Sequence, residues 1–88
     1  MTWAVEFTSK ARKDLARLPV RDQRRIADFL RLRASAREDP RALAKRLAAV
    51  REELWRFRVG DYRVIVQFQD KGMVILVVEI GNRREICR

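Results

Sequence analysis

The clearest alternation of apolar and polar positions lies in the middle of the chain. Residues 54–59 alternate apolar side chains with arginines, and residues 62–68 are rich in β-branched and aromatic side chains. Both patterns are typical of β-strands. Gly60-Asp61 lies between the two segments, and glycine suits the first central position of a type II′ turn. The pattern therefore predicts a β-hairpin that turns at these two residues.

A two-residue turn fixes which residues of this hairpin oppose one another. Arg58 then lies opposite Arg63, and opposed residues share a face of the sheet. One face, the arginine face, carries Arg56, Arg58 and Arg63. The other face carries Phe57, Val59, Tyr62 and Val64. Like charges set opposite each other are unfavourable in a sheet, so this grouping of arginines indicates an anionic partner.

The N-terminal half of the chain predicts one strand followed by two helices. Apolar residues alternate with polar or small ones over residues 2–7, which predicts a short strand with one apolar face. Thr8 or Ser9 can cap a helix over about residues 10–18. Pro19 separates this helix from a second one over about residues 21–36. So short a connection predicts an antiparallel helix hairpin. The alanine-rich segment 41–50 is ambiguous and could form a further short helix.

The apolar run 73–80 predicts a last strand, whose register depends on the turn before it. A two-residue turn at Lys71-Gly72 would mix charged and apolar residues on each face. A three-residue loop over 70–72, with Gly72 left-handed, gives one consistently apolar face, and a buried face specifies register strongly. This loop predicts the pairs Val66 with Leu76, Val64 with Val78, Tyr62 with Ile80 and Arg63 with Glu79. It leaves Ile75 and Val77 on the arginine face.

These elements together predict an α+β fold in a single domain over residues 1–88. An N-terminal strand precedes an antiparallel helix hairpin, which packs on one face of an antiparallel β-sheet. The arginine face on the other side of the sheet is left partly open.

Composition adds a strong positive charge to this picture. The chain has 21 Lys and Arg against 12 Asp and Glu, a formal net charge of +9 and a pI near 11.2. Such a balance implies a polyanionic partner: nucleic acid, an acidic protein or a membrane surface. Arginine predominates among the basic residues, which favours bidentate recognition of phosphate or carboxylate.

The residue inventory removes most common enzyme classes. With one cysteine and no histidine, we expect neither an intrachain disulfide nor a zinc site. There is no glycine-rich phosphate loop, carboxylate pair or metal-ligand cluster, so no cofactor or metal is predicted. Neither a signal peptide nor an apolar run of about 20 residues is visible, and we expect a soluble cytoplasmic chain without a membrane partner. Metal-free RNA cleavage is still compatible with this sequence, because the ribose 2′-hydroxyl is the nucleophile and the protein need not supply one.

The strongest candidate site is a group of four arginines: Arg56, Arg58, Arg63 and Arg83. They could bind a nucleic-acid backbone and stabilise charge on a phosphoryl group, or they could be a solvated strand face with Arg63 paired to Glu79. Cys87 is a second candidate, because neighbouring arginines favour a thiolate, but it could equally be incidental near the C-terminus. The basic outer surface of the helices could contact nucleic acid or simply face solvent.

The segments LWRFRVGDYRVI (residues 54–65) and IGNRREICR (residues 80–88) resemble the RelE/ParE superfamily of type II toxins, on the RelE side. FTSKARKDL (residues 7–15) and KRL (residues 45–47) also fit, so the resemblance covers essentially the whole chain. It implies a compact α+β fold of the microbial ribonuclease type. It also implies a toxin that is neutralised by an acidic antitoxin encoded beside it.

The resemblance implies a reaction and a set of residues. RelE members cut mRNA in the ribosomal A site without a metal and leave a cyclic phosphate. The family's basic sheet residues correspond to Arg63, to Arg83 and to Arg56 or Arg58, which would bind and stabilise the scissile phosphate. The leading hypothesis is therefore a ribosome-dependent mRNA endoribonuclease, with mRNA on the ribosome as its substrate.

Two positions depart from the family's pattern. Asn82 stands where the family usually has His or Lys, and Cys87 stands where it usually has a Tyr that stacks on a base or transfers a proton. Arginine cannot be the base, because its pKa is above about 12. We also expect no lysine on the arginine face. Proton transfer would then fall to Cys87 or Glu79.

Two alternatives use the same fold. One is a ParE-like inhibitor of DNA gyrase, and the other is a catalytically weak toxin that mainly binds its antitoxin. Every version predicts an acidic, helical antitoxin that covers apolar and basic surface in a hetero-oligomer. Such a complex could bind operator DNA through the antitoxin.

Overall fold

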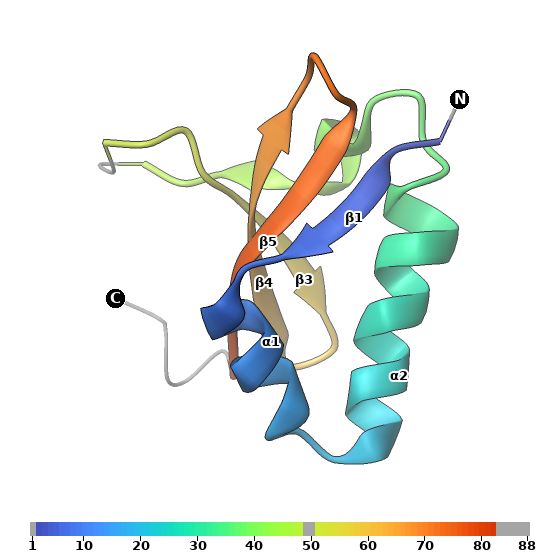
Figure 1. Cartoon of the computed structure of the whole chain (residues 1–88), viewed down its shortest axis with the longest axis vertical. Coiled ribbons are helices and arrows are strands. Elements are labelled where there is room, and N and C mark those ends of the chain that lie inside the picture. The colour runs from blue at the N-terminus through green and yellow to red at the C-terminus, as the bar shows by residue number, and fades with distance from the viewer. Residues whose placement is uncertain (1, 49–50, 83–88) are drawn as a thin grey trace.

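Helices α1 and α2 pack against a five-stranded mixed sheet (Figure 1). The computed structural model describes residues 2–48 and 51–82. The strands, in chain order, are β1 (Ala4–Phe7), β2 (Lys45–Arg46), β3 (Trp55–Val59), β4 (Tyr62–Gln69) and β5 (Val74–Asn82). Their order across the sheet is β1-β5-β4-β3-β2. The helical elements are α1 (Ser9–Ala16), α2 (Val20–Asp28), the π-helical segment η1 (Phe29–Ala34) and the 3₁₀ helix η2 (Pro40–Leu43).

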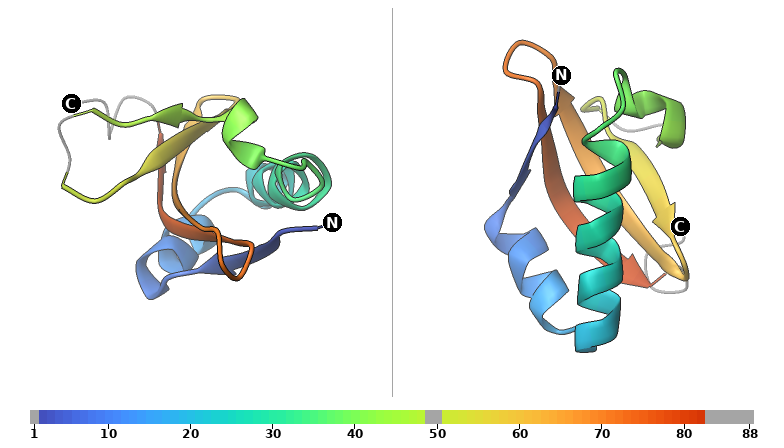
Figure 2. Two further views of the ribbon diagram at one scale, coloured as in Figure 1. Left: turned by 90° about the horizontal axis from the view of Figure 1, so that it is seen from above. Right: turned by 90° about the vertical axis from the view of Figure 1, so that its right-hand side faces the viewer.

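The predicted α+β fold class and helix hairpin are confirmed. Helix α1 leads through the short connection at Pro19 into α2, which runs back in roughly the opposite direction (Figure 2). One feature of the sheet differs from the prediction, because β1 pairs with β5 in parallel and the sheet is therefore mixed. A parallel partner needs a long crossover, and the helices together with β2 to β4 supply it.

In the ambiguous segment, the described residues form the end of the short helix η2 and then the strand β2, which the sequence did not predict. Asp39 caps η2 by accepting a hydrogen bond from the Arg41 N–H, and Pro40 occupies the first turn, where no N–H is needed. The chain then becomes extended as β2. The Leu47 N–H donates to the Leu54 carbonyl, which continues the contact between β2 and β3 beyond the strand itself.

The first hairpin has the predicted register. Val59 pairs with Tyr62, and Arg58 pairs with Arg63, so the turn contains only Gly60 and Asp61. Gly60 has φ +60°, a value that glycine adopts without strain. Phe57, Val59 and Val64 are buried, so the alternation of faces is as predicted.

The predicted register of the second hairpin is wrong. Gln69 pairs with Val74, so the loop has four residues, and Met73 rather than Gly72 is left-handed, with φ 53°. Further along, Val66 pairs with Val77 but Ile65 pairs with Glu79, which leaves Val78 as the extra residue of a β-bulge.

The bulge has a clear physical reason. The core takes in Ile75, Val77 and Ile80, two odd positions and one even position of the same strand. A strand with one uniform register alternates faces and cannot bury all three. The extra residue at Val78 shifts the alternation, so each of these side chains reaches the core. Ile75 and Val77 therefore do not lie on the arginine face.

Side chains from the N-cap and the second half of α1 complete the hydrogen bonding of β5 where β1 ends. The Thr8 hydroxyl accepts a hydrogen bond from the Ala11 N–H and donates one to the Val78 carbonyl. The Asp14 carboxylate accepts a hydrogen bond from the Ile80 N–H at 3.1 Å. Helix α1 thereby protects the edge of β5 beyond the parallel pair.

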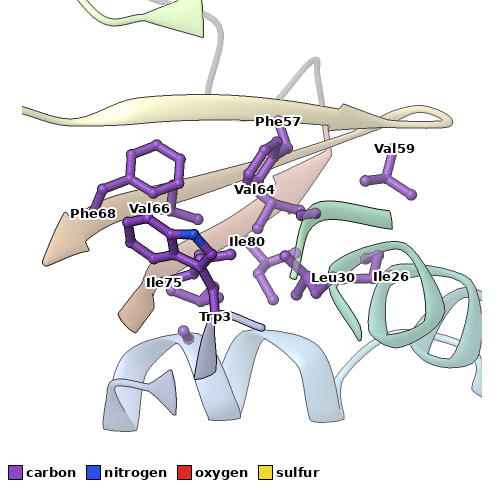
Figure 3. Packing of buried hydrophobic residues seen from close by; sticks show 13 residues of the cluster. Trp3, Ile26, Leu30, Phe57, Val59, Val64, Val66, Phe68, Ile75 and Ile80 are labelled. Carbon is purple, nitrogen blue, oxygen red and sulfur yellow. The ribbon is translucent and has the colours of Figure 1, made fainter. Parts of the chain in front are cut away.

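The hydrophobic core lies between the sheet and the two helices (Figure 3). Phe57 packs edge to face against Phe29 and Phe68, and Phe68 also contacts Trp3 and Trp55 in the same way. Helix α2 contributes Ile26, and η1 contributes Leu30, both fully buried. Throughout the described ranges, every helix is too short and too polar to traverse a bilayer.

Candidate functional site

The side chains of the arginine face project from two paired strands on the side of the sheet opposite the core. Arg56 and Arg58 come from β3, and Arg63 comes from β4. Arg58 is exposed, whereas Arg56 and Arg63 are half-buried. Arg58 and Arg63 lie directly opposite each other in the hairpin, as the sequence predicts. The buried side chains on the opposite face of the same strands, such as Phe57 and Val64, fix the backbone that carries these arginines.

The pairings arrange this face as two rows that cross the strands. One row runs Lys45, Arg56, Ile65 and Glu79, from β2 to β5. The next row runs Arg58, Arg63 and Gly81, from β3 to β5. Neighbouring strands lie about 4.8 Å apart, and long side chains from adjacent positions can therefore contact one common ligand.

Lys45 corrects the prediction that this face has no lysine. It pairs with Arg56 across β2 and β3, and directly opposed residues share a face. The side chain is exposed. The sequence hid this residue because a two-residue strand has no periodicity, and because its alanine-rich surroundings are typical of a helix.

Glu79 lies on the arginine face but not opposite Arg63. It pairs with Ile65, and Arg63 pairs with Gly81 instead. Glu79 is thus a diagonal neighbour of Arg63, a separation that long side chains can span. The β-bulge explains the shift. Gly81 puts no side chain opposite Arg63.

Two predicted site residues lie outside the described residues. Arg83 and Cys87 follow the end of β5, and their position on this face stays a prediction. Tyr62 lies on the core side, where its hydroxyl donates a hydrogen bond to the Asp22 carboxylate at 2.7 Å. Within the two described ranges, no group of three or more metal-ligating side chains comes together.

An apolar groove lies beside the site, between α2 with η1 and the end of β3. It has a volume of about 350 Å³, and its lining combines apolar, basic and acidic residues: Arg25, Asp28, Phe29, Leu32, Arg33, Arg58, Val59 and Gly60. The guanidinium of Arg33 lies over the Phe29 ring, 5.3 Å from its centroid. Leu32 is 68% exposed, which is unusual for so large an apolar side chain.

Comparison with known proteins decides the family. The sequence profile of a family described as the ParE toxin of the type II toxin-antitoxin system, parDE, matches residues 5–87. The chain belongs to this toxin family. It is thus a type II toxin of the RelE/ParE superfamily, as the resemblance implied.

Individual relatives of this toxin carry RelE-type names. Toxin RelG of Mycobacterium tuberculosis is 26% identical over 88 residues, which cover 100% of this chain and 99% of that protein. The toxin-antitoxin complex RelBE2 from the same organism contains a chain with TM-score 0.85 and 25% identity, covering 94% of this chain and 93% of that one. The archaeal RelE–RelB complex of Pyrococcus horikoshii contains one with TM-score 0.69 and 31% identity, covering 94% and 97%.

Proposed function

We propose that this toxin is a ribosome-dependent mRNA endoribonuclease. The observation that carries the proposal is the placement of Arg56, Arg58 and Arg63 on one face of the sheet, where Lys45 and Glu79 lie in the same row as Arg56. Guanidinium groups fit phosphate oxygens in a bidentate manner. Three of them on one rigid sheet can bind the RNA backbone and stabilise the charge of a pentacoordinate phosphoryl group.

The proposed reaction needs no nucleophile from the protein. The ribose 2′-oxygen attacks the adjacent phosphorus, the P–O5′ bond breaks, and the products have a 2′,3′-cyclic phosphate and a 5′-hydroxyl. The arginines orient the backbone and stabilise the developing negative charge. Glu79 is our candidate for the base that accepts the 2′-hydroxyl proton, because it shares the face with Arg63. Cys87 stays an alternative for this role, and Arg83 a further phosphate ligand.

The test is to induce the chain in cells and to map mRNA 5′ ends on translating ribosomes. We expect new ends within codons, confined to translated regions, and arrest of protein synthesis. Intact transcripts together with unaffected translation would contradict the proposal.

A ParE-like action on DNA gyrase is the second candidate. It is favoured by the ParE family match and by Asn82, which departs from the residue expected in an RNA-cleaving relative. Purified toxin would then inhibit gyrase supercoiling while mRNA stays intact. The same pair of assays separates both activities from a toxin that mainly binds its antitoxin and has neither.

We further propose that an acidic antitoxin binds this toxin. Relatives from Mycobacterium tuberculosis and Pyrococcus horikoshii were solved as toxin-antitoxin complexes. The net charge of +9 favours an acidic partner, and the groove beside Leu32 offers apolar surface with arginines around it. Operator DNA would be bound through the antitoxin. Co-expression with the adjacent acidic reading frame should restore growth and give a complex in size-exclusion chromatography.

A further inference from the structure

The row that crosses β2 to β5 ends in Lys45, a residue that the sequence alone does not bring to the site. Lys45 lies directly opposite Arg56, and Arg58 is two residues further along β3 on the same face. We propose that Lys45 is the general acid that protonates the 5′-oxygen as it leaves. This inference rests on the proposed RNA cleavage and names a residue of that reaction.

The segment that carries Lys45 is fixed to the scaffold, as a catalytic group requires. Arg41, four residues earlier, makes a bidentate pair with Asp70, with distances of 3.0 and 2.6 Å. Its guanidinium also lies over Phe68, 4.8 Å from the ring centroid, and over Trp55. The hydrogen bond to Asp70 raises the pKa of Arg41 further above its ordinary value, so this anchor stays charged at any physiological pH.

The chemistry needs a group of this kind. The alkoxide that leaves from the 5′ position is strongly basic, and a donor that protonates it in the transition state lowers the barrier. Arginine gives up a proton only above about pH 12 and cannot fill this role well. Lysine is an ammonium with three protons and can transfer one to the 5′-oxygen. The proton balance then closes, because the base receives the 2′-hydroxyl proton and solvent reprotonates Lys45.

The other lysines of the chain are poorly placed for this step. The chain has four, at positions 10, 13, 45 and 71. Lys10 and Lys13 belong to α1, and Lys10 forms an ion pair with Asp14 at 2.9 Å. Lys71 is in the loop between β4 and β5. Lys45 alone among them pairs with an arginine of the site.

The decisive experiment uses a leaving group that needs no acid. Purified ribosomes are programmed with a short mRNA whose A-site codon has either a normal 5′-oxygen linkage or a bridging 5′-sulfur at the scissile bond. Wild-type toxin, Lys45→Arg and the matched control Lys13→Arg are compared in single-turnover reactions. Lys45→Arg retains the positive charge and removes the readily transferred proton. Thermal melting of each variant shows whether it is folded.

We expect Lys45→Arg to cleave the oxygen linkage about 100-fold more slowly than wild type. It should cleave the sulfur linkage at nearly the wild-type rate, because a thiolate leaves without protonation. Lys13→Arg should match wild type on both substrates. Equal slowing on both linkages, or no slowing on either, would overturn the role of Lys45 while leaving the endoribonuclease intact. A wild-type toxin that cleaves neither substrate would overturn the proposed function, and this inference with it.

Discussion

The two faces of β4 carry side chains with opposite surroundings. Val64 and Val66 point into the core and are fully buried, whereas Arg63 and Ile65, one position away in each case, lie on the outer face and are half-buried. One face holds the fold together, and the other carries the arginines that we propose bind RNA. A strand alternates its faces at every residue, so a single strand can do both. Substitutions on the two faces should therefore affect different properties, stability on one and activity on the other.

The largest effect is expected for Arg63→Ala on the outer face. Removing a group that stabilises transition-state charge should slow mRNA cleavage on ribosomes about 10²–10³-fold and abolish growth inhibition. The melting temperature should stay near that of wild type. Arg24→Ala, at an exposed position of α2, is the matched control and should remain toxic. A toxic Arg63→Ala variant would remove this arginine from the site.

Phe57→Ala on the core face should have the reverse effect. Phe57 is fully buried and packs against Phe29 and Phe68 at centroid distances of 5.3 and 5.9 Å. Emptying this position should lower the free energy of unfolding by about 3–5 kcal/mol, as measured by urea denaturation. The remaining folded fraction should still bind RNA. A loss below about 1 kcal/mol would mean that the core is not organised around this ring.

Gly60→Ala tests the turn that fixes which residues occupy which face. Gly60 has φ +60°, and a Cβ there would lie 2.9 Å from Nη1 of Arg25. We expect a cost of about 1–2 kcal/mol, because an L-residue is strained in the left-handed region. Gly72→Ala is the control, since its Cβ would meet only Val74 at an ordinary 3.5 Å. Equal unfolding midpoints for the two variants would contradict this account of the turn.

The smallest effect is expected at Asp14, beyond the bulge in β5. Burial by itself raises the pKa of Asp14, but the hydrogen bond from Ile80, together with the hydrogen bond and charge of Lys10 and the charge of Arg17, lowers it overall. A lowered folded-state pKa means that the stabilisation is complete above the ordinary aspartate pKa near 4 and is lost as pH falls through the folded value.

Asp14→Asn should therefore reduce stability by about 1 kcal/mol at pH 7. Urea midpoints of wild type and variant should approach each other as the pH falls below about 4 and passes through the lowered folded-state pKa of Asp14. A difference between the midpoints that does not change over the whole acid range in which the protein stays folded would show that the charge of Asp14 contributes nothing.

Local signals explain which parts of the fold the sequence predicts. The β3–β4 register follows from Gly60 and from the alternation on either side of it, so the Arg58–Arg63 pair is predictable. The β4–β5 register cannot be predicted in this way. It depends on the bulge at Val78, which allows Ile80 to be buried and is in contact with the N-cap of α1. The parallel pairing of β1 depends on contacts between distant segments, for which residues 2–7 carry no local signal.

The candidate site divides in the same way. Arg56, Arg58 and Arg63 are brought together by one hairpin, and the sequence places them correctly on one face. Lys45 reaches that face only through pairing of β2 with β3, and the bulge sets Glu79 opposite Ile65 rather than opposite Arg63. Site residues that lie on one hairpin can be predicted from the alternation of apolar and polar positions along its strands. A residue such as Lys45, which joins the site through pairing with a distant strand, can be placed only from the structure.

The most direct test of the central claim is to identify the ends that purified wild-type toxin leaves on an mRNA bound in the A site of purified ribosomes, with gyrase supercoiling measured in parallel. We predict a single cut within the A-site codon, a 2′,3′-cyclic phosphate on the upstream fragment, a 5′-hydroxyl on the downstream fragment, and unaffected gyrase. Intact mRNA with inhibited supercoiling would contradict it.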